Sequence, residues 1–161
     1  MYIRLIRNKA KGNAITGRLV IDGRWFCNTL ERKGYQILAL CYSVRVTMSP
    51  KFKRLLPIIQ NVPASPKSSP KGKDFNSEEK LPSLQGGAGV GSYRSGIRFH
   101  RGSKPEHSTG CILVPKDKEI ELTNIVKNAQ SNEEIILEVI DYSPGTEYGY
   151  NTPYSSELQK R

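Results

Sequence analysis

Apolar and polar residues alternate along the first part of the chain, the pattern of β-strands with one buried face. Residues 2–7 alternate in this way, and Lys11-Gly12-Asn13 then turns the chain. Residues 14–21 and 25–30 form two further runs, separated by Asp22-Gly23, a typical two-residue hairpin turn. The pattern therefore predicts one strand followed by a β-hairpin.

The next apolar residues fall into shorter segments. Residues 37–41 and 42–47 fit either one bent strand or two short strands. Residues 55–59 and Val62-Pro63 are also apolar, but each segment contains a proline, which argues against a regular helix. We expect this region to be an apolar loop that packs onto the sheet.

The second half of the chain predicts two short strands, one helix and a last strand. A strand leads from Gly96 into His100, a polar loop follows, and residues 112–114 form the second short strand. Asp117 can cap a helix with one apolar face, formed by Ile120, Leu122, Ile125, Val126 and Ala129. Residues 135–142 form the last strand. The predicted fold class is mainly β, a sandwich or barrel-like sheet with one α-helix after Cys111.

Residues 64–95 differ from the rest in being rich in Ser, Pro, Lys and Gly. Such a stretch buries too little apolar surface to offset the entropy of ordering, so we expect a flexible insertion. It is either a lid beside His100 or, as we favour, a tolerated surface loop. The sequence thus predicts a single β domain over residues 1–142, with this insertion and a loosely held tail over residues 143–161.

Composition limits the classes of function. The chain has 161 residues, enough for one domain, and no apolar run approaches the roughly 20 residues that cross a bilayer. Its net charge of +10 is uneven, with 20 Lys and Arg against 5 Asp and Glu through Pro105 and 5 against 10 beyond it. This asymmetry fits an anionic partner or a solvated basic surface. The sequence contains no recognised nucleic-acid motif, so nucleic acid is disfavoured as a partner, and we expect a monomer.

The three cysteines, Cys27, Cys41 and Cys111, show no CxxC or Cys/His ligand spacing, so neither a disulfide framework, a metal site nor a cofactor is indicated. We interpret Cys27 and Cys41 as core residues of apolar strands. The first residues lack the apolar core of a secretory signal, so we expect cytoplasmic synthesis. Action outside the cytoplasm would then need a dedicated secretion system or release by lysis; the alternative is a substrate inside the cell.

Both histidines of the chain lie close to Cys111 in the sequence. Two strands joined by a short loop can place His100 opposite Cys111, and a thiol paired with an imidazole is a nucleophile with its base. If His100 activates Cys111, alkylation of the thiol should proceed well below pH 8.5. A backbone carbonyl or Ser103 could orient the imidazole, and the amides of Gly110 and Cys111 are candidate oxyanion donors. The alternative is a buried structural thiol.

The residues around this pair resemble a known active site. The segment from Ile97 to Ser103, followed by Ser108-Thr109-Gly110-Cys111, resembles the motif of L,D-transpeptidases, an apolar-led His-Gly-Thr/Ser and then Ser-His-Gly-Cys. Thr109 stands where those enzymes carry a second histidine, and His107 is a candidate substitute for it. A broader similarity, to a family of small uncharacterised bacterial and phage proteins, covers Asn28–Glu31, Ser49–Phe52, Asn61–Pro63 and Gly96–Val114.

The resemblance implies a cysteine-dependent acyltransferase or hydrolase that acts on peptidoglycan stem peptides through a thioester on Cys111. His100 would take the thiol proton, and Ser108, Thr109 and Gly110 would complete the catalytic segment. Arg98, Ser103, His107 and Glu31 are the candidate substrate-binding residues, and a muropeptide is the expected partner. The alternative function is a non-catalytic basic binding module, either a degenerate wall-binding relative or a phage or mobile-element accessory protein.

Overall fold

The computed structural model describes residues 1–63 and 93–144. Within them, the chain forms a mainly β fold with one α-helix and one short 3-10 helix. The elements, in chain order, are β1 (Tyr2–Arg7), β2 (Ala14–Ile21), β3 (Arg24–Arg32), β4 (Cys41–Ser49), β5 (Arg54–Ile59), β6 (Val62–Pro63), β7 (Tyr93–Arg94), β8 (Phe99–Arg101), η1 (Pro105–His107), β9 (Ile112–Val114), α1 (Lys116–Ala129) and β10 (Ile136–Ile140).

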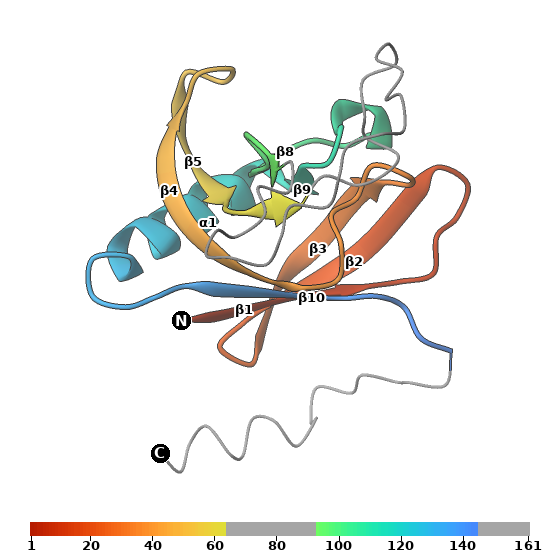
Figure 1. Cartoon of the computed structure of the whole chain (residues 1–161), viewed down its shortest axis with the longest axis horizontal. Helices are drawn as coiled ribbons and strands as arrows, with labels where there is room; N and C mark the ends of the chain where they lie inside the picture. The colour runs from red at the N-terminus through yellow and green to blue at the C-terminus, as the bar shows by residue number, and fades with distance from the viewer. Residues whose placement is uncertain (64–92, 145–161) are drawn as a thin grey trace, which may run out of the picture.

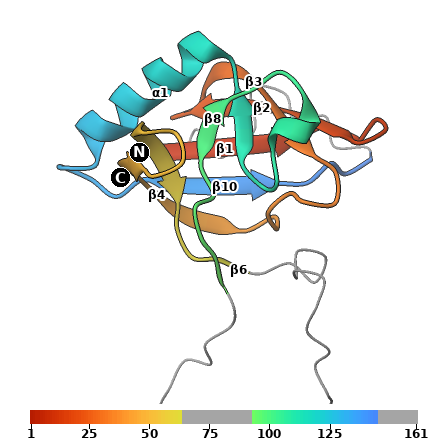
Figure 2. The same ribbon diagram turned by 90° about the horizontal axis from the view of Figure 1, so that it is seen from above.

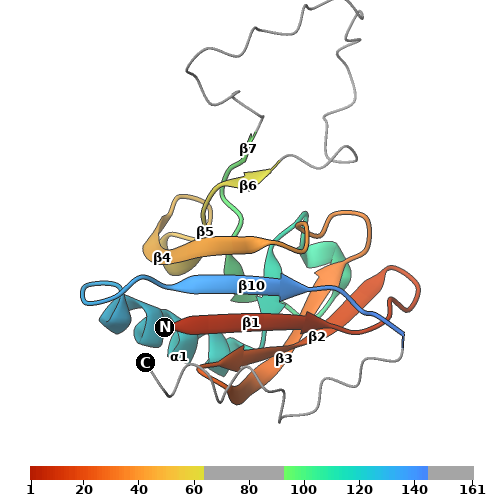
Figure 3. The same cartoon turned by 60° about the horizontal axis from the view of Figure 1, so that its bottom comes forward.

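Eight of the strands form one sheet in the order β5-β4-β10-β1-β2-β3-β9-β8. β1 and β10 lie side by side at its centre and run parallel, and β4 and β2 flank them (Figure 3). The two ends of the sheet approach each other, because Ile58 of β5 bridges Arg98 and the Ile59 amide donates to the Ile97 carbonyl at 2.9 Å. The sheet is therefore a nearly closed barrel (Figure 1).

The core fills the inside of this barrel. Ile3, Leu5 and Leu19 point inward from the central strands, and Phe99 and Ile112 point inward from β8 and β9. The helix α1 lies along one side of the barrel and adds Leu122 and Val126 to the same core (Figure 2). The expected helix is confirmed, but it begins at Lys116 after Pro115, without a side-chain cap from Asp117. Within the described residues, no helix is long and apolar enough to cross a membrane.

The first strands are confirmed, whereas the region after them differs from the prediction. Residues 37–40 form no strand, and β4 begins at Cys41. Residues 54–59 are not a loop but strand β5, which pairs with β4 along its whole length. Pro57 is tolerated there because β5 lies at the end of the sheet, where half of a strand's amide groups face no partner strand.

The prediction that both Cys27 and Cys41 belong to the core is half right. Cys27 is buried among the core side chains. Cys41 is exposed, because it opens β4 on the face opposite to the buried Tyr42.

Most of the expected insertion and tail lies outside the described residues. Tyr93 and Arg94, at the end of the predicted insertion, form β7 and pair with Pro63 and Val62 of β6. These two strands form a separate ribbon beside the barrel (Figure 3). Arg94 is thereby brought back toward the strands that carry His100 and Cys111.

Candidate active site

Parallel pairing of β8 with β9 places His100 and Cys111 on the same face of the sheet. His100 pairs in register with Leu113 of β9, and Cys111 lies two residues before Leu113, directly ahead of this strand. Side chains two residues apart on extended backbone share a face of the sheet, so His100 and Cys111 lie on the same face, one step apart. The sequence predicted two strands joined by a loop, and the structure specifies that they run parallel.

The Cys111 side chain is partly buried against the backbone that leads into β8. Its Sγ lies 3.8 Å from the Gly96 carbonyl oxygen, to which the thiol donates. Burial raises the pKa of the Cys111 thiol, while a hydrogen bond from the Arg98 backbone and the charges of Lys51, Arg94 and Arg98 act in the opposite direction. This direction favours the protonated thiol at rest and argues against the expected alkylation well below pH 8.5.

The buried His100 is held in one tautomer by the main chain. Its Nδ1 lies 3.0 Å from the Arg101 carbonyl oxygen. Because a carbonyl only accepts hydrogen bonds, Nδ1 carries the proton and Nε2 keeps its lone pair. Burial and the charges of Lys51 and Arg54 lower the pKa of His100, while the Arg101 hydrogen bond and the Glu119 charge act to raise it. At neutral pH His100 is thus an uncharged imidazole, the form that accepts a proton.

Arg98 is a buried cation on the same face as Cys111. Its guanidinium donates to the carbonyls of Leu56 (2.9 Å), Thr47 (3.1 Å) and Met48 (3.2 Å) and to the Thr47 hydroxyl (2.9 Å). All four acceptors are neutral, so they orient the guanidinium without cancelling its charge. Burial lowers the pKa of Arg98, and the neighbouring Cys111 acts to raise it. Arg98 is placed to stabilise negative charge at Cys111 rather than to reach far into solvent.

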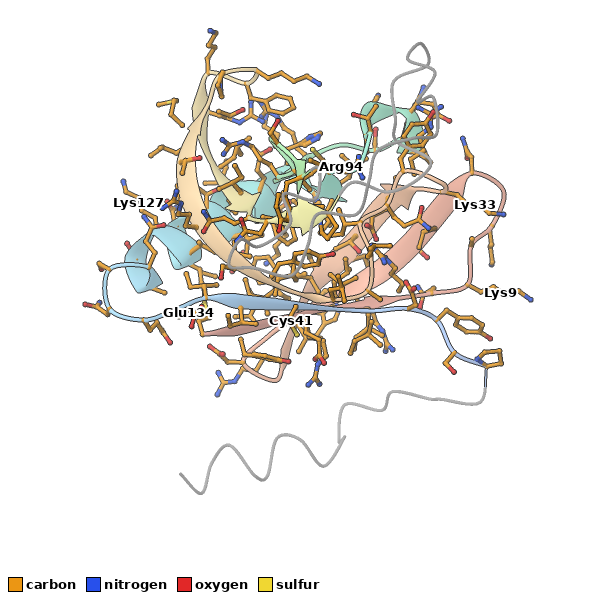
Figure 4. The ribbon with its side chains drawn as sticks, viewed as in Figure 1. Lys9, Lys33, Cys41, Arg94, Lys127 and Glu134 are labelled. Carbon is orange, nitrogen blue, oxygen red and sulfur yellow. The ribbon has the colours of Figure 1, made fainter. Side chains whose placement is uncertain are left out.

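Arg94 holds the turn that precedes Cys111. Its guanidinium donates to the Tyr35 carbonyl at 2.8 Å and to the Thr109 carbonyl. A Cβ on Gly110 would lie 2.0 Å from Arg94 Nη2, and the Gly110 φ is +129°, so only glycine fits beside this guanidinium. Figure 4 shows Arg94 at the β8 and β9 side of the barrel, whereas Cys41 lies by β10.

Ser108 stabilises the same turn through hydrogen bonds to its backbone. Its buried hydroxyl donates to the Cys111 carbonyl at 2.6 Å and accepts from the Gly110 amide at 3.0 Å. The Gly110 amide is therefore engaged within the turn in this structure, and the Cys111 amide is the remaining member of the predicted oxyanion pair. Thr109 is exposed, and its carbonyl is the group that meets Arg94.

The other predicted site residues lie apart from the reacting pair. Ser103 and His107 are exposed in the loop between β8 and β9, and the Arg101 carbonyl, rather than Ser103, contacts the imidazole. Glu31 is buried inside the barrel in a bidentate ion pair with Arg7, at 2.7 and 2.8 Å. Burial raises the pKa of Glu31, and Arg7 opposes this shift. The predicted contacts of these residues with substrate stay predictions.

Sequence reasoning assigned no role to Arg94, Lys51, Phe52 or Glu119. Lys51 and Phe52 form the tip of the β4–β5 hairpin, and the Phe52 ring lies 4.6 Å from the His100 ring, centroid to centroid. Their segment, Ser49–Phe52, was the available signal, since it belongs to the broader similarity. Arg94 is brought to the site by β6–β7 pairing, which the sequence pattern does not reveal.

Within the described residues, no group of three or more His, Cys, Asp or Glu side chains is arranged to hold a metal ion. Comparison of the chain with protein families, with curated proteins and with solved structures finds no match.

Proposed function

We propose that the protein is a cysteine-dependent acyltransferase or hydrolase that acts on peptidoglycan stem peptides, of the L,D-transpeptidase or L,D-carboxypeptidase type. The observation that carries the proposal is that Cys111 and His100 share one face of the sheet, one register step apart, with His100 Nδ1 bonded to the Arg101 carbonyl so that Nε2 can accept a proton. The local resemblance of the Ile97–Ser103 and Ser108–Cys111 segments to L,D-transpeptidases supplies the substrate class. A mainly β domain agrees with that resemblance.

The reaction begins from the neutral pair. His100 Nε2 takes the proton of Cys111 as Sγ forms a bond to the carbonyl carbon of the stem peptide. The resulting oxyanion is stabilised by the Cys111 amide and by the positive charge of Arg98 and Arg94. As the carbon–nitrogen bond breaks, the imidazolium returns the proton to the leaving amine, and a thioester remains on Cys111.

The second half of the reaction releases the acyl group. An acceptor amine gives a cross-link, and water gives a shortened stem peptide; in both cases His100 removes a proton from the attacking group and returns it to Sγ. The cations around Cys111 suit an acyl donor that carries carboxylates. The Arg or Asn that L,D-transpeptidases usually carry just after the cysteine is absent from Ile112-Leu113-Val114, and we infer that these cations take over its part.

Product analysis tests this function. Wild-type protein, Cys111→Ala and His100→Gln are incubated with tetrapeptide muropeptides, and the products are separated and identified by mass spectrometry. We expect trimmed or cross-linked products from the wild type alone. Identical product profiles for wild type and Cys111→Ala would exclude the proposed chemistry.

A further inference from the structure

A buried carboxylate lies behind His100, on an element that contributes no residue to the reacting pair. Glu119 belongs to the first turn of α1 and is 2% exposed. The helix begins directly after β9 and packs against β8 and the β4–β5 hairpin (Figure 1). A buried carboxylate must be compensated by hydrogen bonds or by an opposite charge, so its partners indicate its role.

Glu119 has two partners, and one belongs to the backbone that orients His100. The Arg101 amide donates to Glu119 Oε2. Arg101 is also the residue whose carbonyl accepts the proton of His100 Nδ1 at 3.0 Å. The carboxylate therefore fixes the amide side of the same residue whose carbonyl side selects the imidazole tautomer.

The second partner, Arg54, links the carboxylate to the aromatic ring beside His100. Arg54 Nε and Nη2 donate to Glu119 Oε1 and Oε2 at 3.0 and 2.8 Å. The Arg54 guanidinium carbon lies 5.2 Å from the centre of the Phe52 ring, and this ring contacts the His100 ring at a centroid distance of 4.6 Å and an angle of 38°. One carboxylate thus holds both the backbone and the aromatic ring that enclose His100.

We propose that Glu119 is the positioning residue of His100. It keeps Nδ1–H on the Arg101 carbonyl and holds Phe52 against the imidazole through Arg54, so that Nε2 stays directed at the Cys111 face of the sheet. The Glu119 charge also acts to raise the pKa of His100, against burial and the charges of Lys51 and Arg54, which lower it. The inference rests on the proposed function only in using His100 as the base.

A purely structural role makes a different prediction. If Glu119 only ties α1 to the β4–β5 hairpin, removing its charge would lower stability but leave the imidazole tautomer as it is. If Glu119 positions His100, the tautomer changes in a protein that is still folded. The tautomer is therefore the measurement that separates the two roles, and it requires no substrate.

The experiment records imidazole nitrogen NMR spectra over a pH series. His100 and His107 are the two histidines of the chain, so a His107→Gln background leaves a single imidazole to observe. In the His107→Gln protein without further substitutions, we expect His100 to be in the Nδ1–H form. Glu119→Gln should introduce the Nε2–H form and lower the pKa of His100. Glu121→Gln, on the exposed side of the same helix, is the matched control and should leave both unchanged.

Tautomer and titration of His100 in Glu119→Gln that match those of the control would overturn the proposal. If Glu119→Gln does not fold, Arg54→Gln is measured instead, because it releases Phe52 but leaves the Arg101 amide bonded to Glu119. An unchanged tautomer and titration of His100 in Arg54→Gln would also overturn the proposal. With active protein, we expect Glu119→Gln to lower kcat about 10- to 100-fold and to change KM little. Loss of a partner that orients an imidazole has an effect of this size at metal sites. The tautomer result does not depend on the muropeptide assay, so the two proposals can fail separately.

Discussion

At the scale of single residues, the site is governed by burial acting against charge. Burial raises the pKa of Cys111 and lowers that of His100, so both groups are uncharged at rest. Three cations, Lys51, Arg94 and Arg98, oppose the shift at Cys111 without overcoming it. The pair is therefore arranged for proton transfer during the reaction rather than for a permanent thiolate.

The first prediction concerns the alkylation of Cys111. In the folded protein, iodoacetamide should modify Cys111 with an apparent pKa above that of the same thiol in urea, because only the thiolate reacts. Lys51→Gln should slow the reaction at a fixed pH by about 1.4- to fivefold, the effect of a charge interaction worth about 0.2–1 kcal/mol. The rate is followed by peptide mass spectrometry.

Lys127→Gln provides the control for this measurement, since Lys127 lies near the end of α1 and is not among the charges that act on Cys111 (Figure 4). An equal effect of the Lys51 and Lys127 substitutions would contradict the electrostatic account.

The second prediction concerns His100 and stability. Because the pKa of His100 is lowered in the folded state, the unfolded chain binds the proton more readily as the pH falls through about 6.5. The contribution of neutral His100 to stability is complete above that pH and declines below it. Urea unfolding at pH 7.5 and 5.5 should show a larger loss for wild type than for His100→Gln. A parallel loss in both proteins would mean that His100 is not buried in its neutral form.

At the scale of elements, the turn before Cys111 depends on a close fit between Gly110 and Arg94. Gly110→Ala places a methyl group against the guanidinium and forces φ +129° on a residue with a side chain. We expect a loss of about 1–3 kcal/mol in the free energy of unfolding from the backbone alone, with a further loss from the collision.

Denaturant unfolding of single and double variants measures this third prediction. Gly110→Ala combined with Arg94→Ala should recover the part due to the collision. Gly12→Ala is the control, because Gly12 has φ +59° with no atom within 4 Å of its added Cβ. If Gly110→Ala costs no more than Gly12→Ala, Arg94 does not constrain the turn.

Elements whose pattern is local could be predicted from the sequence, and elements that depend on distant pairing could not. Alternation and the Asp22-Gly23 turn suffice for β1, β2 and β3, and the apolar face suffices for α1. β5 was not predicted, because Pro57 makes the segment look like a loop when only its own sequence is considered. Pairing with β4 stabilises it as a strand.

The same distinction applies to the site. Cys111 and His100 were predicted from residue type and spacing, since a thiol and an imidazole are informative by themselves. Arg94, Lys51 and Glu119 come from three other elements, and only the register of β6–β7, the curl of the β4–β5 hairpin and the start of α1 bring them together. The sequence pattern does not reveal that these residues lie near one another.

At the scale of the whole molecule, the barrel interior encloses an ion pair between β1 and β3. Arg7 and Glu31 are 4% and 1% exposed, and Asp141 extends the pair toward the rim with a 2.9 Å bond. The fourth prediction is that Glu31→Leu costs about 3–5 kcal/mol of stability, because it leaves Arg7 buried without its bidentate partner.

Arg7→Met combined with Glu31→Leu should be less destabilising than Glu31→Leu alone, as measured by denaturant unfolding. The double variant also tests the predicted contact of Glu31 with substrate. If Glu31 serves the fold alone, the folded double variant should retain product formation; loss of product with intact stability would instead support a substrate-binding role.

Formation of a thioester between Cys111 and a stem peptide can be detected by intact-protein mass spectrometry. Wild-type protein is mixed with a tetrapeptide donor in the absence of an acceptor amine, quenched in acid and mapped by peptide. We expect an added acyl mass on Cys111 that hydroxylamine removes, with none on Cys41 and none in Cys111→Ala. A donor that leaves Cys111 unmodified while wild type still turns it over would contradict the account.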